Sequence, residues 1–160
     1  LIRLESTAGT LEATREVVAA RNDGRIKMHL TWKALGFRRD NRELFESGRY
    51  LPLAVEGARL EHVCAFERSV NDSSILVVVP RFCSRLMADT GSLPLGQEVW
   101  QDTRVIQPFD SASSSYRNVF TGEILTLDQQ EGRLTLALKD IFSVYPVAML
   151  ERINRTGETV

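Results

Sequence analysis

Few residues in this sequence are of the types that perform catalysis. Its only histidines are His29 and His62, and its only cysteines are Cys64 and Cys83. A cysteine nucleophile needs a neighbouring base and a lowered pKa, whereas both cysteines lie within apolar segments, which predicts small buried side chains instead. We predict structural roles for both histidines, with His29 on a helix flank and His62 on the same strand face as Leu60 and Cys64.

Sequence motifs for metal, phosphate or nucleophile sites are also missing. There is no Cys-x-x-Cys or His-Glu-x-x-His spacing, so no zinc site is predicted. There is no Gly-x-Ser-x-Gly elbow and no phosphate-binding glycine loop. The 21 acidic residues offer many carboxylate pairs, but none lies in a recognisable catalytic setting. We therefore predict no catalytic residue, no metal and no cofactor.

The aromatic side chains are the remaining candidates for direct ligand contact. Trp32, Trp100, Tyr50 and Tyr116 have rings that can stack on sugars. Their neighbours in the sequence are mostly apolar, which favours core or domain contacts over an exposed sugar platform.

Composition and charge indicate an ordinary globular chain. Its 160 residues, 43% hydrophobic and 26% charged, fit one domain or one domain with a helical attachment. The net charge of -1 gives no electrostatic reason to expect nucleic acid or an anionic membrane as a partner. No apolar run approaches the roughly 20 residues that span a bilayer, and no signal-peptide pattern occurs. Together with the two cysteines, this predicts a soluble cytoplasmic protein in a reducing compartment.

The elements that must position these side chains change character near Gly48. Helices are predicted at residues 10–20, 25–39 and 42–45, so residues 1–48 form a helical segment. Asp23 is expected to accept backbone amides at the start of the second helix, and Gly48 to end the third in a left-handed conformation.

The second helix carries apolar residues on two opposed arcs. At about 100° per residue, the first arc holds Ile26, Leu30, Ala34 and Phe37. The second arc, almost opposite, holds Met28, Trp32 and Leu35. Because a surface helix needs only one apolar stripe, two stripes predict two packing neighbours. One neighbour is the following domain; the other is either the first helix or a partner outside this chain.

Residues 49–151 have the pattern of an antiparallel β-sandwich. Short strands are predicted at 51–55, 60–66, 75–79, 103–107, 116–120, 124–127, 134–138 and 144–150. Since no crossover helices separate them, the strands are expected to be antiparallel, which gives an α+β fold. The apolar run 75–79 predicts a central strand, whereas Pro146 predicts that the last strand lies at an edge or a bulge. Residues 152–160 are expected to fray.

Several segments in order resemble one enzyme family. The first is Asp23-Gly-Arg-Ile-Lys-Met-His-Leu-Thr-Trp-Lys-Ala-Leu. Others are Glu61-His-Val-Cys-Ala-Phe, Val77-Val-Val-Pro-Arg, Trp100-Gln-Asp-Thr-Arg, Tyr116-Arg-Asn-Val-Phe-Thr-Gly-Glu and Tyr145-Pro-Val-Ala-Met-Leu. These segments run through most of the chain and resemble the C-terminal region of malto-oligosyltrehalose synthases, members of the α-amylase superfamily.

The resemblance implies a parent enzyme that isomerises the reducing-end linkage of malto-oligosaccharides into a trehalose unit. Its retaining mechanism uses two carboxylates on a (β/α)₈ barrel, and nothing in this chain aligns with them. The chain, which begins at Leu1 rather than methionine, is then expected to be a non-catalytic C-terminal accessory domain of a longer polypeptide. Two alternatives remain open, namely an autonomous maltodextrin-binding module and an interaction domain without a ligand.

The resemblance also implies that the helical segment 1–48 is a remnant of the catalytic barrel, the last barrel helices, and it assigns a partner to the second helix. One of its stripes is expected to dock on the missing barrel, and in the isolated chain to be exposed or covered by a second copy through self-association. Arg25 or Lys27, in the turn that starts this helix, could hold a hydroxyl of the malto-oligosaccharide substrate. The alternative for these two residues is a helix cap with solvated charges.

Overall fold

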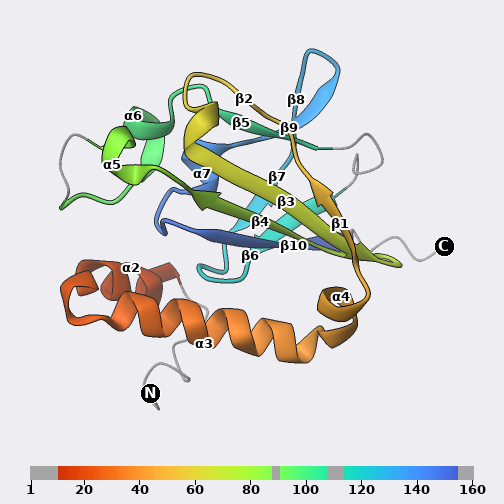
Figure 1. Cartoon of the computed structure of the whole chain (residues 1–160), viewed down its shortest axis with the longest axis horizontal. Coiled ribbons are helices and arrows are strands. Elements are labelled where there is room, and N and C mark those ends of the chain that lie inside the picture. Colours follow the sequence, from red (N-terminus) through yellow and green to blue (C-terminus); the bar gives the residue numbers. More distant parts are fainter. Residues whose placement is uncertain (1–10, 88–90, 108–113, 155–160) are drawn as a thin grey trace.

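The computed structural model describes residues 11–87, 91–107 and 114–154, in which helices and two sheets are stacked in layers (Figure 1). The N-terminal helices, within residues 11–46, lie on one side of a six-stranded sheet, and a four-stranded sheet lies on the other. All strand pairs recorded in the two sheets are antiparallel. The predicted α+β class, with helices followed by an antiparallel β-sandwich, is confirmed.

The N-terminal helices form the first layer. They are α2 Leu11–Ala19, the short 3-10 helix η1 Arg21–Asp23, α3 Arg25–Asp40 and α4 Arg42–Glu46. The backbone N–H of Arg25 donates to Asp23 Oδ1 at 3.1 Å, as predicted for the start of α3. Gly48 follows α4 for a different reason from the one expected. It does not have a positive φ, but a Cβ there would lie 2.1 Å from the carbonyl oxygen of Leu44.

The six-stranded sheet has the order β1-β3-β4-β10-β6-β7. Its strands are β1 Arg49–Pro52, β3 Val63–Val70, β4 Ser73–Pro80, β6 Ser114–Asn118, β7 Ile124–Thr126 and β10 Ala148–Asn154. The four-stranded sheet has the order β2-β5-β9-β8, from β2 Val55–Glu56, β5 Arg104–Gln107, β8 Asp128–Gln130 and β9 Arg133–Ala137. Short helices connect the strands, namely η2 Leu60–His62, α5 Cys83–Leu86, α6 Gly96–Trp100 and α7 Leu138–Ile141.

Two apolar clusters hold the layers together. The inner cluster lies between the sheets and includes Leu76, Val78, Trp100, Val105, Tyr116, Leu136, Phe142 and Leu150. The outer cluster joins the six-stranded sheet to the helices and is centred on Leu44, Ile75, Phe120, Tyr145 and Met149. Ile75 and Leu76 are neighbours on β4, both are 0% exposed, and they belong to different clusters. The prediction that this strand is central and covered on both faces is confirmed.

The inward face of β3 is not the predicted one. Val63, Ala65 and Glu67 are buried, whereas Cys64 is exposed. Leu60 lies in η2 before the strand, so it does not set the alternation of β3. Apolar residues occur on both faces of β3, which is why the sequence pattern did not identify the inward face.

The prediction that both cysteines are buried is wrong. Cys64 points out from β3, and Cys83 begins the short helix α5 and is also exposed. His62 is 5% exposed as part of η2, and it does not share a strand face with Leu60 or Cys64.

The last strand also differs from expectation. β10 begins at Ala148, after Pro146, and lies between β4 and β6 in the middle of its sheet. The expected edge position is therefore wrong, because a proline that precedes a strand removes no hydrogen bond from its ladder. β10 continues to Asn154, past the predicted end of the last strand at Leu150, while residues 155–160 lie outside the described part. The predicted strand 51–55 is divided between β1 and β2, which belong to different sheets.

Candidate functional site

The long helix α3 packs one apolar stripe against the outer cluster. This inner stripe consists of Ile26, Leu30, Ala34 and Phe37, all partly buried there. The hydroxyl of Tyr145 donates a hydrogen bond to the carbonyl oxygen of Ile26 at 2.7 Å, and the rings of Phe37 and Phe45 meet edge to face at 6.1 Å. These contacts fix which side of α3 faces the domain.

A single carbonyl oxygen ties both α2 and α3 to the loop after β6. The oxygen of Phe120 accepts from Thr14 Oγ1 at 3.0 Å and lies 3.2 Å from His29 Nε2. The Phe120 ring stacks on Tyr145 at 5.3 Å, and His29 meets Tyr145 edge to face at 5.6 Å. Burial lowers the pKa of His29, so its neutral imidazole donates from Nε2 to the carbonyl. His29, 2% exposed, is thus a structural side chain.

The opposite stripe of α3 faces outward without a covering element among the described residues. This outer stripe consists of Met28, Trp32 and Leu35, which are 52%, 37% and 58% exposed. The expectation that one stripe is left exposed in the isolated chain is confirmed for these residues. Three large apolar side chains in a row on one helix face form the type of surface that marks an interaction site.

Grooves lie beside the outer stripe. One, of about 510 Å³, is lined by Trp32, Lys33, Leu35, Gly36, Phe37, Arg39, Asp40 and Val119. A second, of about 410 Å³, is lined by Leu35, Arg38, Arg39, Arg42, Phe45 and Glu46. Leu35 belongs to both grooves and therefore forms a ridge between them. The surface can receive side chains from a partner on either side of this ridge.

Positive charge surrounds the outer stripe. Within α3 the basic residues are Arg25, Lys27, Lys33, Arg38 and Arg39, and the only acid is Asp40. Some cations are paired: Arg25 with Asp23 at 2.6 Å, Arg39 with Asp40 at 2.9 Å, and Arg42 of α4 with Glu46 at 2.7 Å. Among the described residues, no carboxylate lies within ion-pair distance of Lys27, Lys33 or Arg38. Partial burial and the charge of Arg117 lower the pKa of Lys33.

The two sugar-binding candidates lie at the start of α3. The Arg25 guanidinium donates from Nε to Asp23 Oδ2 at 2.6 Å, so the side chain is engaged by its own turn. Lys27 is exposed two residues further along, ahead of the outer stripe. Asp23 thus accepts the backbone N–H of Arg25, while the N-cap residue of α3 is Gly24, and a role for Arg25 or Lys27 in sugar binding stays a prediction.

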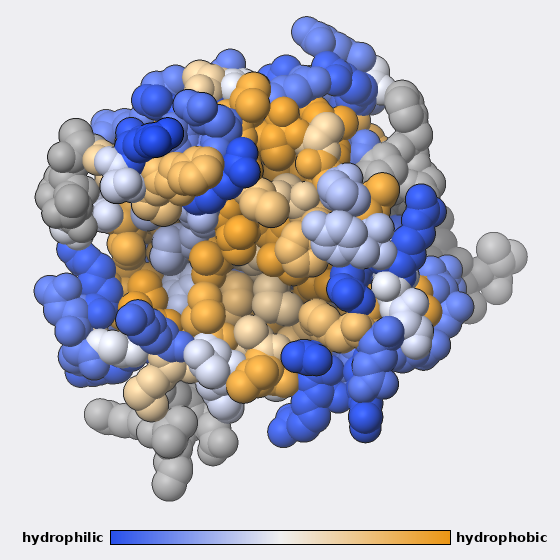
Figure 2. Space-filling model, viewed as in Figure 1, coloured by the Kyte–Doolittle hydropathy of each residue, from blue (hydrophilic) through white to orange (hydrophobic). Residues whose placement is uncertain are grey.

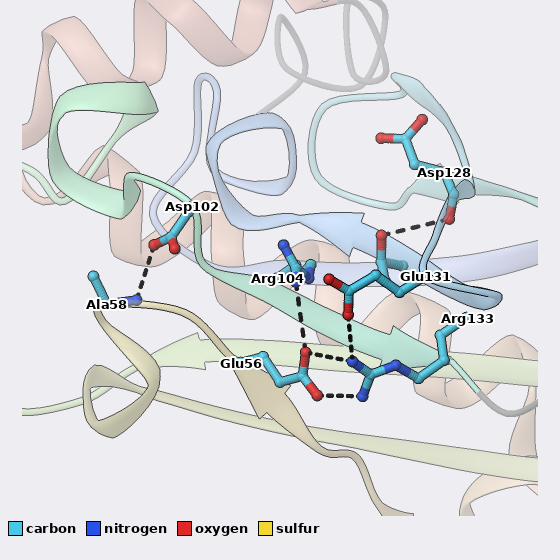
Figure 3. A network of polar contacts seen from close by, with 8 residues as sticks. Glu56, Ala58, Asp102, Arg104, Asp128, Glu131 and Arg133 are labelled. Atoms are coloured by element: carbon cyan, nitrogen blue, oxygen red, sulfur yellow. Dashed lines mark hydrogen bonds and ion pairs between the residues drawn. The ribbon is translucent and has the colours of Figure 1, made fainter.

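The outward face of the four-stranded sheet is organised by ion pairs instead (Figure 3). Glu56 of β2 binds Arg133 of β9 through both carboxylate oxygens, and it lies 3.6 Å from Arg104 of β5. Glu131 contacts the same Arg133 at 3.5 Å. Nearby, Asp102 accepts the backbone N–H of Ala58 at 2.9 Å, a bond that lowers the pKa of the Asp102 carboxyl.

Sequence reasoning missed further exposed apolar side chains near β1 and β3. Tyr50, Leu60 and Phe82 are each more than half exposed. On the face of the molecule that Figure 2 shows, apolar residues gather in the middle, around β3 and above α3. Phe82 has a φ of 54°, a left-handed value that is rare for a bulky residue, and the guanidinium of Arg81 lies 5.0 Å from its ring centroid. No pattern in the sequence marks such a backbone conformation.

The prediction of burial for the four aromatic candidates holds for two of them. Trp100 and Tyr116 are fully buried, as expected, whereas Trp32 and Tyr50 are exposed. Within the described residues, no group of three or more histidine, cysteine or acidic side chains could hold a metal ion. None of the described helices has the length and apolarity required to cross a membrane.

The fold and the α3 face define a sandwich domain with a helical layer that presents an uncovered apolar stripe. No protein-family model and no curated protein matches the chain. It is similar to the solved structure of a point mutant of maltooligosyltrehalose synthase from Arthrobacter ramosus, with a TM-score of 0.59 and 26% identity. The match covers 88% of this chain but 17% of that enzyme, so this chain spans a small part of its length. The predicted resemblance is confirmed, and the coverage is consistent with the C-terminal region.

Proposed function

We propose that this chain is the C-terminal accessory domain of an intramolecular glucosyl transferase that converts malto-oligosaccharides to malto-oligosyltrehalose. One observation carries the proposal: α3 buries its inner stripe in the domain and leaves Met28, Trp32 and Leu35 uncovered. The similarity to 17% of a maltooligosyltrehalose synthase supplies a partner, since most of such an enzyme lies outside the matched region.

In this proposal the outer stripe docks on the catalytic barrel of the same polypeptide. Burying a large aliphatic or aromatic side chain stabilises a contact by about 1.5–3 kcal/mol relative to its full exposure. Leu35, which is 58% exposed between two grooves, is placed to insert into the barrel surface. The domain then holds the last barrel helices in place, and we infer that its boundary with the helical segment falls between residues 48 and 49.

The chemistry belongs to the barrel. A retaining glucosyl transfer uses one carboxylate as nucleophile and a second as acid and base, and no residue of this chain is assigned either role. This chain's direct contribution to the substrate is limited to the α3 start, where Lys27 or Arg25 would hold a sugar hydroxyl. The proposed setting is cytoplasmic, in agreement with two exposed cysteines that are not bridged.

The test compares one substitution in two contexts. Leu35→Glu should lower the unfolding temperature and the isomerase activity of the longer polypeptide, while leaving the isolated chain's unfolding temperature nearly unchanged. Ile124→Glu is the matched control, because Ile124 on β7 is similarly exposed at 55% and lies outside the grooves of α3. If Leu35→Glu changes neither the unfolding temperature nor the activity of the longer polypeptide, docking through α3 is refuted.

Calorimetry tests whether the sugar is recognised by the barrel or by this chain. Titration of the isolated chain with maltoheptaose should show no binding, because recognition lies on the barrel in this proposal. Binding that disappears in a Trp32→Ala variant would instead assign a sugar site to the α3 face of this chain.

A further inference from the structure

The charges around the outer stripe carry information about the surface that covers it. α3 has five basic residues and one acidic residue in a chain whose net charge is -1. The paired cations are satisfied by neighbours in the chain, whereas Lys33 and Arg38 have no carboxylate partner among the described residues. Both line the grooves on either side of Leu35.

We infer that the occupant of the α3 face is an acidic surface of the same polypeptide, with an apolar strip that meets Leu35 and carboxylates that meet Lys33 and Arg38. This inference rests on the proposed function and adds the chemistry of the partner. Covering unpaired cations without counter-charges would leave them desolvated, at a cost that carboxylates on the facing surface remove.

The geometry around Lys33 supports the need for a counter-charge. Lys33 lines a third groove with Arg117, Phe37 and Glu151, but Glu151 is already bound to Arg117 at 2.6 Å. The ammonium lies 5.5 Å from the centroid of the Trp32 ring, which directs it toward the outer stripe. An incoming carboxylate at this position would therefore meet an ammonium that has no acidic partner in the described chain.

A second copy of the chain fits this surface poorly. A two-fold dimer through α3 would place the same basic helix against itself, and like charges across an interface are unfavourable. A lipid surface fits less well than an acidic protein surface, because an interfacial helix buries a broad apolar face. The inner stripe of α3 is committed to the domain, which leaves only Met28, Trp32 and Leu35 for a bilayer.

The experiment reverses the charges and follows thermal unfolding of the longer polypeptide at about 50 mM and about 1 M NaCl, where screening is weak and strong. Lys33→Glu and Arg38→Glu should each lower the unfolding temperature at low salt, and the loss should shrink at high salt. In the isolated chain, the same variants should unfold no earlier than the parent, because they break no ion pair there. Lys139→Glu in α7, an exposed lysine outside the grooves, is the charge-reversal control and should be neutral in both contexts.

The outcomes separate this inference from the proposed function. An equal loss in the isolated chain would overturn the inference by showing that the cations act within the domain. If Leu35→Glu destabilises the longer polypeptide but the charge reversals do not, docking stands and an acidic partner is rejected. If Leu35→Glu has no effect either, the proposed function itself fails.

Two further measurements on the isolated chain test whether a second copy or a lipid surface covers the α3 face instead. Sedimentation should show a monomer, and a dimer that Trp32→Glu dissociates would overturn the inference in favour of a second copy. Vesicles containing phosphatidylserine should not bind the chain, and binding that Arg38→Glu abolishes would overturn it in favour of an anionic lipid surface.

Discussion

The outward faces of the helical layer and of the four-stranded sheet differ in whether their charged side chains have ion-pair partners. On the sheet, Glu56 joins Arg104 and Arg133 in one network that crosses β2, β5 and β9. On α3, Lys33 and Arg38 lack such partners among the described residues, and Leu35 beside them is exposed. A face that pairs its own charges is adapted to water, whereas a face with exposed apolar residues and unpaired cations is complementary to another surface.

The largest effect should come from removing the contact that fixes α3 to the domain. Phe120→Ala deletes a ring that is 2% exposed and stacked on Tyr145, so we expect a loss of about 3–5 kcal/mol in the free energy of unfolding. Urea denaturation of the isolated chain measures this loss. Met28→Ala, on the outer stripe of α3, is the comparison and should change the value by less than about 0.5 kcal/mol. Similar losses in both variants would remove the distinction between the covered and the uncovered side of α3.

A smaller effect should follow from pH on the helix side. Burial lowers the pKa of His29 in the folded chain below the ordinary value of about 6.5, so the unfolded state binds more protons at mildly acidic pH. The contribution of neutral His29 is complete above about pH 6.5 and is lost as the pH falls from there through the lower folded pKa. The positive charge of Lys33 lowers the pKa of His29 further. The other groups that contact His29 are the ring of Tyr145 and the carbonyl oxygen of Phe120.

His29→Gln is the variant that isolates this titration. Unfolding curves measured at several pH values from 7.5 downward should converge for parent and variant as the pH falls, because only the parent loses the contribution of His29. Curves that stay parallel would show that another group dominates the pH dependence.

On the sheet side, breaking the ion-pair network should cost less. Glu56→Gln removes the carboxylate that holds Arg104 and Arg133, and we expect the unfolding temperature to fall by only a few degrees, since these side chains are partly exposed to solvent. The loss should shrink in about 1 M NaCl, where the pairs are screened. A loss that is independent of salt would mean that Glu56 acts through packing rather than charge.

The smallest effect should be that of Leu35→Glu in the isolated chain. Because Leu35 is 58% exposed there, we expect a change within about 0.5 kcal/mol in the free energy of unfolding, measured by urea denaturation. Solubility should rise, since a charge interrupts the apolar stripe. A loss above about 2 kcal/mol would show that the outer stripe stabilises the domain itself and is not an unoccupied surface.

Much of the fold followed from local pattern. The helical period predicted α3 and its two stripes, and the unbroken apolar run predicted the central strand β4. β3 was harder, since apolar residues on both of its faces give no preference for Cys64 or Ala65 as the inward side. Pro146 was misread because the sequence does not show that the strand starts only at Ala148, after the proline.

Only part of the candidate site could be predicted from the sequence. The sequence showed that α3 has two apolar stripes, because helical spacing alone places Met28, Trp32 and Leu35 opposite Ile26 and Leu30. It did not show which stripe packs, because both have similar size and apolarity.

By itself, the sequence determined the elements, the two-stripe helix and the resemblance to one enzyme family, since these depend on residue order and local period. Only the tertiary structure decided that the inner stripe is covered and the outer one exposed. The choice depends on contacts from distant residues: Tyr145 reaches the Ile26 carbonyl, and the Phe120 carbonyl reaches His29. It also decided which cations of α3 have partners, because a charge is neutralised by its neighbours in space, which residue order alone does not specify.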